Sequence, residues 1–241
     1  MKTIAFIAIT LLAGAIAGTI LGVVNQLAVE PYIEHAIELE MQNTAQSGQL
    51  INPAEFAAYR FWQKGGEIAA GTILGLSIGS LYGIVFAYTR GLVPGSNNKK
   101  KALIVAGIMW FVLFLMPALK YPANPPAVGN PETIYYRQSL YIAFLAISGF
   151  SALGLAFLYQ KVASLNINKA IIPSAYAAIM AGAYLAMPAN PDSINAPIDL
   201  VIGFRLTSAI TISMFWGLLG IIFGTFWDKL NPDETTRISV R

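Results

Sequence analysis

Candidate metal ligands gather in one short stretch of the chain, EPYIEHAIELE at residues 30–40. Glu30, Glu34 and Glu38 recur every fourth residue, and His35 is the single histidine of the sequence. If the stretch is helical, the three carboxylates share one face and repel each other by roughly a few tenths of a kcal/mol per pair. A bound cation would relieve that repulsion, and carboxylates with one imidazole suit divalent cobalt, nickel, zinc or manganese. The stretch is therefore a candidate outer binding site for such an ion.

The same pattern is typical of an amphipathic helix on a membrane surface. Ile33, Ala36, Ile37 and Leu39 would then face lipid while the acidic residues face water. Residue types alone favour this simpler interpretation, since a closed site for a first-row metal usually has more than one nitrogen or sulfur ligand. Both interpretations are kept, because a second chain could supply further ligands.

Other chemistry is sparsely represented. The sequence has no Walker-type Gly-Lys-Ser/Thr loop for ATP and no recognisable nucleophile with a histidine neighbour. The absence of cysteine excludes disulfides and thiolate metal sites, and the seven methionines are scattered through apolar runs instead of forming a copper-type cluster. We therefore expect neither an enzyme nor a resident cofactor, with a metal ion entering only as substrate.

The composition indicates a membrane protein, because 56% of the 241 residues are hydrophobic and only 11% are charged. About 20 apolar residues cross the hydrocarbon core of a bilayer. Six windows approach or exceed that length: residues 4–29, 66–89, 102–119, 138–159, 170–187 and 200–226. The first is too long for a secretory signal, so we expect it to remain as a span. We predict an all-α integral membrane protein, a single polytopic domain over residues 1–241 with about six transmembrane helices, of which the short third and fifth could be partly re-entrant.

Two proline-rich segments share the sequence Pro-Ala-Asn-Pro, at residues 122–125 and 188–191. Proline fixes φ and removes a backbone donor, so the stretch 120–141 is predicted to be a rigid turn and not a helix. The basic residues beside these loops fit snorkelling within an aromatic belt, or ion pairs with Glu132, Asp192 or Asp199 that hold the loops in place. The loop residues singled out are Lys120, Pro122, Asn124, Pro125, Glu132, Arg137, Pro188, Asn190, Pro191 and Arg205.

Lysines and arginines set the predicted orientation in the plasma membrane. Arg90, Lys99, Lys100, Lys101, Lys161 and Lys169 fall in the connections after the second and fourth windows. By the positive-inside rule that side, with both termini, is cytoplasmic. Both proline loops and the acidic first connection then face out, and the net charge of +3 needs no nucleic-acid partner.

Glycines recur every four residues in the first two windows, at Gly14, Gly18 and Gly22 and at Gly71, Gly75, Gly79 and Gly83. Without side chains on one stripe, two helix backbones can approach closely and gain van der Waals contact that lipid cannot supply. We expect the two helices to pack tightly. Static packing is favoured over a sliding surface because such motifs are common in membrane helices.

The order helix, proline loop, helix occurs twice in the second half of the chain. Each loop is followed by an arginine near the next span, Arg137 in one case and Arg205 in the other. This order would fit a parallel repeat of the kind that transporters use. Loop lengths differ and shared residues are few, so a duplication and an independent origin both stay open.

Three segments together resemble the CbtA family of predicted cobalt transporter subunits: EPYIEHAIELE at 30–40, RFWQKGG at 60–66 and KYPANPPAVGNPETIYYRQSLY at 120–141. The similarity spans most of the chain in the expected order, and the proline loop is its most specific part. The resemblance implies a polytopic protein that works with a small partner, CbtB, which supplies a histidine-rich metal-binding segment in cells where cobalt serves cobalamin synthesis.

Three functions are compatible with the sequence. The first is a lipid-embedded subunit of a cobalt or related divalent-metal transporter, working with a CbtB-like partner in a homo- or hetero-oligomer. The second is a structural or assembly subunit of a larger membrane complex, for which Glu34 and His35 would be dispensable. The third, transport of another small solute, would need a mid-membrane polar cavity, for which the candidates are Asn25, Ser77, Ser80, Ser148, Ser151 and Thr211.

Overall fold

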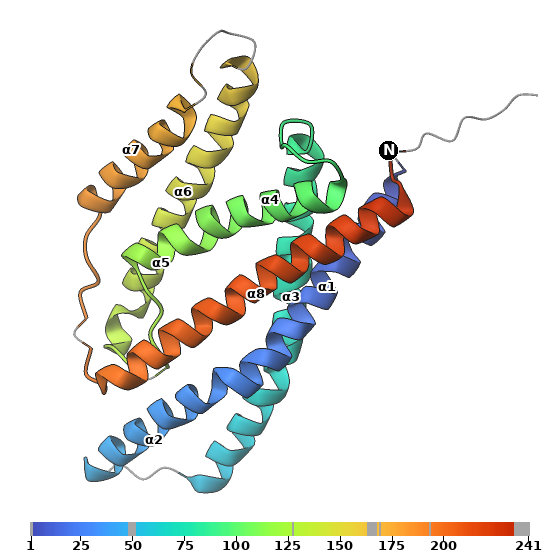
Figure 1. Ribbon diagram of the computed structural model, residues 1–241. Helices are drawn as coiled ribbons and strands as arrows, with labels where there is room; N and C mark the ends of the chain where they lie inside the picture. The colour runs from blue at the N-terminus through green and yellow to red at the C-terminus, as the bar shows by residue number, and fades with distance from the viewer. Residues whose placement is uncertain are drawn as a thin grey trace, which may run out of the picture. The chain divides into compact units, whose positions relative to one another are not determined.

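The computed structural model describes residues 2–47, 52–126, 128–162, 168, 170–192 and 194–233. The helical elements are α1 (Thr3–Ala28), α2 (Glu30–Gln46), α3 (Pro53–Thr89), α4 (Asn98–Trp110), the π-helical η1 (Phe111–Leu115), α5 (Met116–Lys120), the 3-10 turn η2 (Pro131–Thr133), α6 (Ile134–Val162), α7 (Ile171–Ala186) and α8 (Ile198–Leu230). These residues include no strand (Figure 1). The prediction of an all-helical chain is confirmed.

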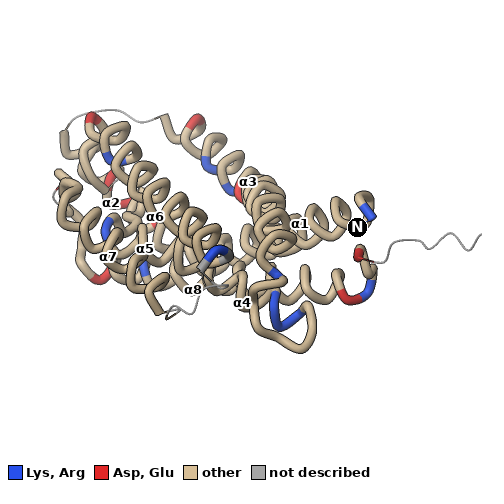
Figure 2. Tube along the Cα trace, turned by 90° about the horizontal axis from the view of Figure 1, so that it is seen from above, with Lys and Arg blue, Asp and Glu red and all other residues tan. Residues whose placement is uncertain are grey.

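Five helical runs are long and apolar enough to cross a membrane: α1, α3, the run from α4 through α5, the run from η2 into α6, and α8. The third predicted window lies in an uninterrupted run of 23 residues, whereas α7 has 16 and is the shorter sixth helix. The helices α1 and α8 are uncharged over most of their length (Figure 2). The chain is a multi-span membrane protein of about six helices. Lys169, part of the predicted cytoplasmic charge, lies outside the described residues.

Helix boundaries depart from the predicted windows where caps start a helix early. α3 begins at Pro53, well before residue 66, because the Asn52 side chain accepts the Ala54 N–H and Pro53 takes the first helical position. The prediction that the stretch 120–141 is all turn is wrong for its second half. Asn130 Oδ1 accepts the Glu132 N–H at 2.9 Å, and helix follows from Pro131 onward.

Contacts group the described chain into two compact units. Unit one contains the residues up to Gly107 and those from Leu206 onward, and unit two is Ile108–Arg205. The expectation of a single polytopic domain stays a prediction.

In unit one, α1 and α3 pack backbone against backbone, side by side (Figure 1). A Cβ atom on Gly14 would lie 2.3 Å from the carbonyl oxygen of Gly75, and one on Gly18 would lie 2.2 Å from that of Gly71. Real Cβ atoms do not approach so closely, so each of these glycines is required by the contact itself. The same stripes continue through Gly22, Gly79 and Gly83.

An aromatic cluster packs α3 against α8 in unit one. Tyr82 and Phe86 of α3 meet Phe223 and Trp227 of α8, with all four side chains essentially inaccessible to solvent. The Tyr82 hydroxyl donates to the carbonyl of Ala102 in α4 at 2.6 Å. Large ring areas give this end of the unit its packing energy, and the hydrogen bond satisfies the tyrosine hydroxyl.

In unit two, the third span stays helical but changes to a π-helical turn at η1, which ends two residues before Pro117. The Met116 N–H bonds the carbonyl of Phe111, five residues earlier. The next bond of that type would need an N–H from Pro117, which proline lacks. The buried hydroxyl of Ser148 in α6 donates to the Val112 carbonyl at 2.6 Å in its place.

Candidate functional site

The acidic stretch is helical, and α2 begins at Glu30 with proline at its second position. Glu30, Glu34 and Glu38 therefore lie on one helix face, where residues four apart are neighbours. His35 and Glu38 are exposed, whereas Glu30 is buried. The three carboxylates thus run from the interior of unit one to its surface.

Two cations of α3 face these carboxylates. Arg60 forms an ion pair with Glu30, and Lys64 forms one with Glu34 while its Nζ also lies 3.7 Å from Glu30 Oε1. The side chains of Glu30 and Arg60 are 9% and 11% exposed, whereas those of Glu34 and Lys64 are 46% and 40% exposed. The positive charge that relieves the carboxylate repulsion therefore comes from the chain itself, in an inner buried pair and an outer solvated pair.

The outer pair keeps its carboxylate ionised. The hydrogen bond from Lys64 lowers the pKa of Glu34, desolvation opposes this shift, and the positive charges of Lys64 and Arg60 add to the lowering. Glu34 is consequently an anion that a divalent cation could bind after displacing Lys64.

The structure does not bring the predicted ligands together as a preformed site. Within the described ranges, no group of three or more histidine, aspartate or glutamate side chains is placed to hold a metal ion. The assignment of Glu30, Glu34, His35 and Glu38 as metal ligands stays a prediction. The sequence analysis did not identify Arg60 and Lys64 as partners of these carboxylates. Their four-residue spacing matches that of Glu30 and Glu34, and this match could have indicated the pairing.

The two proline loops are tied together inside unit two. Asp192 of the second loop accepts the Asn130 N–H at 2.9 Å and the Thr133 hydroxyl at 2.8 Å. Its carboxylate is 5% exposed and lies 3.0 Å from Arg137 Nε, an ion pair without the alignment of a hydrogen bond. One buried carboxylate in the second loop thus holds the end of the first.

A reciprocal contact involves the other loop arginine. Arg205 Nε donates to the carbonyl of Ala123 at 3.0 Å, and its NH2 donates to Asn124 Oδ1 at 2.6 Å. Each arginine therefore anchors the proline loop that it does not directly follow. Of the predicted ion pairs, Arg137 forms the one with Asp192, whereas Arg205 contacts its loop through hydrogen bonds to a carbonyl and an amide oxygen.

Some of the remaining predicted loop residues add contacts to this framework. Lys120 donates to the Tyr184 carbonyl at 2.8 Å, and the Tyr121 hydroxyl donates to the carbonyl of Pro188 at 2.6 Å. Pro125 is buried, while Glu132 and Pro191 are exposed. Pro122 and Asn190 line a pocket beside the first loop.

The hydroxyl groups considered for a mid-membrane solute cavity bond mostly to nearby backbone. Ser77 and Ser80 donate to carbonyls four residues earlier, and Thr211 donates to Ser208. Such bonds satisfy a hydroxyl inside its own helix. They give no support to a polar transport cavity.

Comparison with known proteins assigns the chain at family level. The family model described as probable cobalt transporter subunit (CbtA) matches residues 3–228 of the 241. Neither the curated proteins nor the solved structures gave a match.

Proposed function

Because the chain belongs to the CbtA family of probable cobalt transporter subunits, we propose that it is the membrane-spanning subunit of a cobalt transporter and works with a small CbtB-like partner. The observation that carries this proposal is the family match over nearly the whole chain. The family description, which names one part of a transporter, supports a complex, and the apolar helices supply a membrane-embedded body.

The outer binding site in this proposal is the exposed part of α2. Glu34, His35 and Glu38 present oxygen and nitrogen ligands of the kind that divalent cobalt accepts. Glu30 is held by Arg60, so its contribution is to fix the end of the acidic face next to Lys64. An arriving ion and Lys64 then compete for Glu34, and the partner supplies further ligands.

Uptake of cobalt-57 into cells tests this function. Cells express the chain with and without its candidate partner, and wild type is compared with Glu34→Gln and His35→Ala. Uptake should require the chain and fall in both variants, while Glu40→Gln, which removes a carboxylate outside the four-residue series, should match wild type. Equal accumulation by wild-type and empty-vector cells would reject the transporter function in favour of a structural role in a larger complex.

In the same uptake experiment, Lys64→Gln should strengthen cobalt binding, whereas Glu34→Gln and His35→Ala should weaken it. Removing the competing ammonium group frees Glu34, so we expect half-maximal uptake at a lower cobalt concentration. An unchanged or higher concentration would reject α2 as the binding site without rejecting transport.

The proposed orientation places both termini in the cytoplasm. The Lys2 N–H donates to the Pro232 carbonyl at 2.6 Å, so both described chain ends lie at the same end of unit one. Arg90, after α3, pairs with Asp233 at that end. Asn98 at the start of α4 bonds Asp228 near the same end, so Lys99, Lys100 and Lys101 lie there as well. The positive-inside rule counts lysines and arginines, and these residues with Arg90 support a cytoplasmic assignment.

A further inference from the structure

A pocket of about 780 Å³ lies beside the first proline loop, entirely within unit two. Its wall is mainly apolar, with prolines of the loop and Val128, Ile134 and Leu140 among the lining residues. Pockets for small organic molecules have this size and this combination of an apolar wall with a few polar groups. The volume is far larger than a bare metal ion needs.

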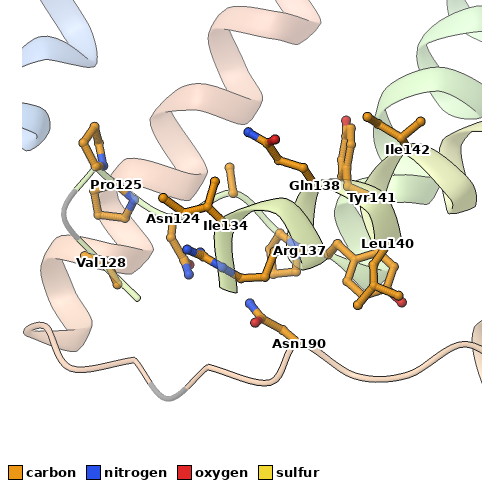
Figure 3. A pocket seen from close by; sticks show the side chains of 14 residues that line it. Asn124, Pro125, Val128, Ile134, Arg137, Gln138, Leu140, Tyr141, Ile142 and Asn190 are labelled. Atoms are coloured by element: carbon orange, nitrogen blue, oxygen red, sulfur yellow. The ribbon is translucent and has the colours of Figure 1, made fainter. Parts of the chain in front are cut away.

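Three polar lining residues lie close together at the pocket, and Gln138 lies apart from them. Asn124 comes from the first Pro-Ala-Asn-Pro segment, Asn190 from the second, and Arg137 from the start of α6. Figure 3 shows Asn124 and Asn190 on either side of the Arg137 side chain. Both copies of the repeated sequence therefore contribute their asparagine to the same pocket.

The framework fixes which atom each asparagine offers. Asn124 Oδ1 accepts from the Arg205 guanidinium, and Asn190 Oδ1 accepts the Asp192 N–H at 3.0 Å. A guanidinium and a backbone N–H can only donate, so the amide oxygens must face them. Neither Nδ2 group has a hydrogen-bond partner among the described residues, which leaves two N–H donors for a ligand.

The charge balance favours an anion. Arg137 lines the pocket and Arg205 bonds Asn124, whereas Asp192, paired with Arg137, is the one carboxylate in contact with these groups in the part of the chain described. Amide donors next to a guanidinium recognise carboxylate oxygens and repel a bare divalent cation. This chemistry differs from that of the acidic face of α2.

We propose that the pocket binds a small organic acid, with its carboxylate on Asn124, Asn190 and Arg137 and its apolar part against the proline and aliphatic wall. The site lies outside the acidic stretch and does not depend on the cobalt function. An anionic lipid headgroup shares the oxyanion chemistry, so the test separates the two sources.

The test measures binding of phenylacetate and of 2-phenylethylammonium to the full chain in phosphatidylcholine nanodiscs, by saturation-transfer NMR, with empty nanodiscs as the blank. The probes share an apolar ring and differ in the sign of charge. Wild type should bind phenylacetate and discriminate against the ammonium compound. Failure to bind phenylacetate, or equal binding of both probes, would overturn the proposal.

Asn124→Asp and Asn190→Asp supply the matched variants. Each keeps an oxygen for Arg205 or for the Asp192 N–H and replaces only the free N–H donor by an anionic oxygen, so the loop framework is retained. Phenylacetate affinity should fall by at least about tenfold in both, as expected for a charge-assisted bond turned into repulsion. Asn168→Asp, which keeps its acceptor role toward the Ala170 N–H outside the pocket, should bind as wild type.

Unchanged phenylacetate affinity in both pocket variants would contradict the assignment. A second measurement in nanodiscs that also contain phosphatidylglycerol tests whether an anionic lipid headgroup occupies the pocket in place of phenylacetate. Phenylacetate binding should persist in them. Its loss would overturn the organic-acid assignment and identify a lipid headgroup as the occupant.

Discussion

At the scale of single residues, burial decides what the ion pairs between α2 and α3 contribute. Glu30 and Arg60 are nearly inaccessible, so Glu30→Gln leaves a buried guanidinium without its counter-charge. Breaking a buried pair on one side costs about 3–5 kcal/mol, whereas an exposed pair contributes about 0–1 kcal/mol. We therefore expect Glu30→Gln to lower the thermal unfolding midpoint of the detergent-solubilised protein strongly, and Lys64→Gln to lower it little. Equal shifts would contradict this assignment of the inner pair.

A second prediction concerns acid stability at the end of α8. Hydrogen bonds from Arg90, opposed by desolvation and assisted by the Trp227 indole N–H at 3.2 Å, lower the pKa of Asp233 from its usual 3.8. The unfolded chain therefore binds this proton at a higher pH than the folded chain. The stabilisation is complete above about pH 4 and is lost as pH falls through the lowered folded value.

Because Asp233 is 42% exposed, its contribution is below about 1 kcal/mol. Asp233→Asn should flatten the acid limb of the unfolding midpoint plotted against pH, and Arg90→Gln should do the same. A wild-type slope in both variants would show that this pair does not couple to folding.

The sequence indicated which charged side chains belong to the candidate site, but it did not indicate which residues pair with them. The acidic face of α2 could be read from spacing alone, because residues four apart on a helix must be neighbours. The Arg60 and Lys64 contacts join residues 30 positions away, which helical periodicity does not encode. Asp192 was one of three acids considered for the loop arginines, and only the folded loops select it.

At the scale of elements, the α1–α3 contact depends on glycine. A Cβ atom on Gly75 would lie 2.2 Å from the Gly14 carbonyl oxygen and 2.7 Å from Gly18 Cα, so Gly75→Ala must push the helices apart. We expect a loss of about 1–3 kcal/mol or more, the usual cost of overpacking. Gly66→Ala in the same helix meets nothing within 4 Å and should be neutral or slightly stabilising. Thermal unfolding of the two variants checks this, and equal destabilisation would argue against helix contact as the cause.

The bond between α6 and η1 supports a second prediction at this scale. Ser148→Ala leaves the Val112 carbonyl without its donor in an apolar interior, at a cost of about 1–3 kcal/mol. Ser77→Ala is the control, because Ser77 is exposed and its hydroxyl donates only to Ile73 of its own helix. Thermal unfolding compares the two variants. A smaller loss of stability in Ser148→Ala than in Ser77→Ala would refute the role assigned to the hydroxyl.

Helix existence was predictable from hydropathy, whereas helix ends were not. Apolar windows located the long helices because a span needs about 20 apolar residues. The polar start of α3 and the whole of α2 lie outside any such window, and caps at Asn52 and Asn130 set two of the starts. The π-helical turn could not be anticipated from the sequence, because Pro117 leaves the Val112 carbonyl without a backbone donor and Ser148 of a different helix supplies the hydrogen bond.

At the scale of the whole molecule, topology is the feature to test first. The chain has no cysteine, so single cysteines report sidedness directly. In intact cells a membrane-impermeant maleimide should label Glu40→Cys on α2. It should label Lys100→Cys, in the basic start of α4, only after permeabilisation. The reverse pattern would invert the proposed orientation.

The two proline loops connect this topology to the family assignment. Arg137 and Arg205 each hold the opposite loop, and the shared Pro-Ala-Asn-Pro sequence places an equivalent asparagine from each at one pocket. This arrangement fits a parallel duplication of a helix, loop and helix, which stays a prediction. In either case hydrogen bonds and an ion pair join the two loops, while the metal ligands on α2 stay a prediction.

We propose above all that this chain is the membrane-spanning subunit of a cobalt transporter. The most direct test of this claim is cobalt flux into liposomes that contain the purified chain with its purified small partner and enclose a metal-quenched dye. We predict quenching on addition of cobalt that needs the chain and is reduced by Glu34→Gln. Quenching no faster than in liposomes with the partner alone would contradict the claim.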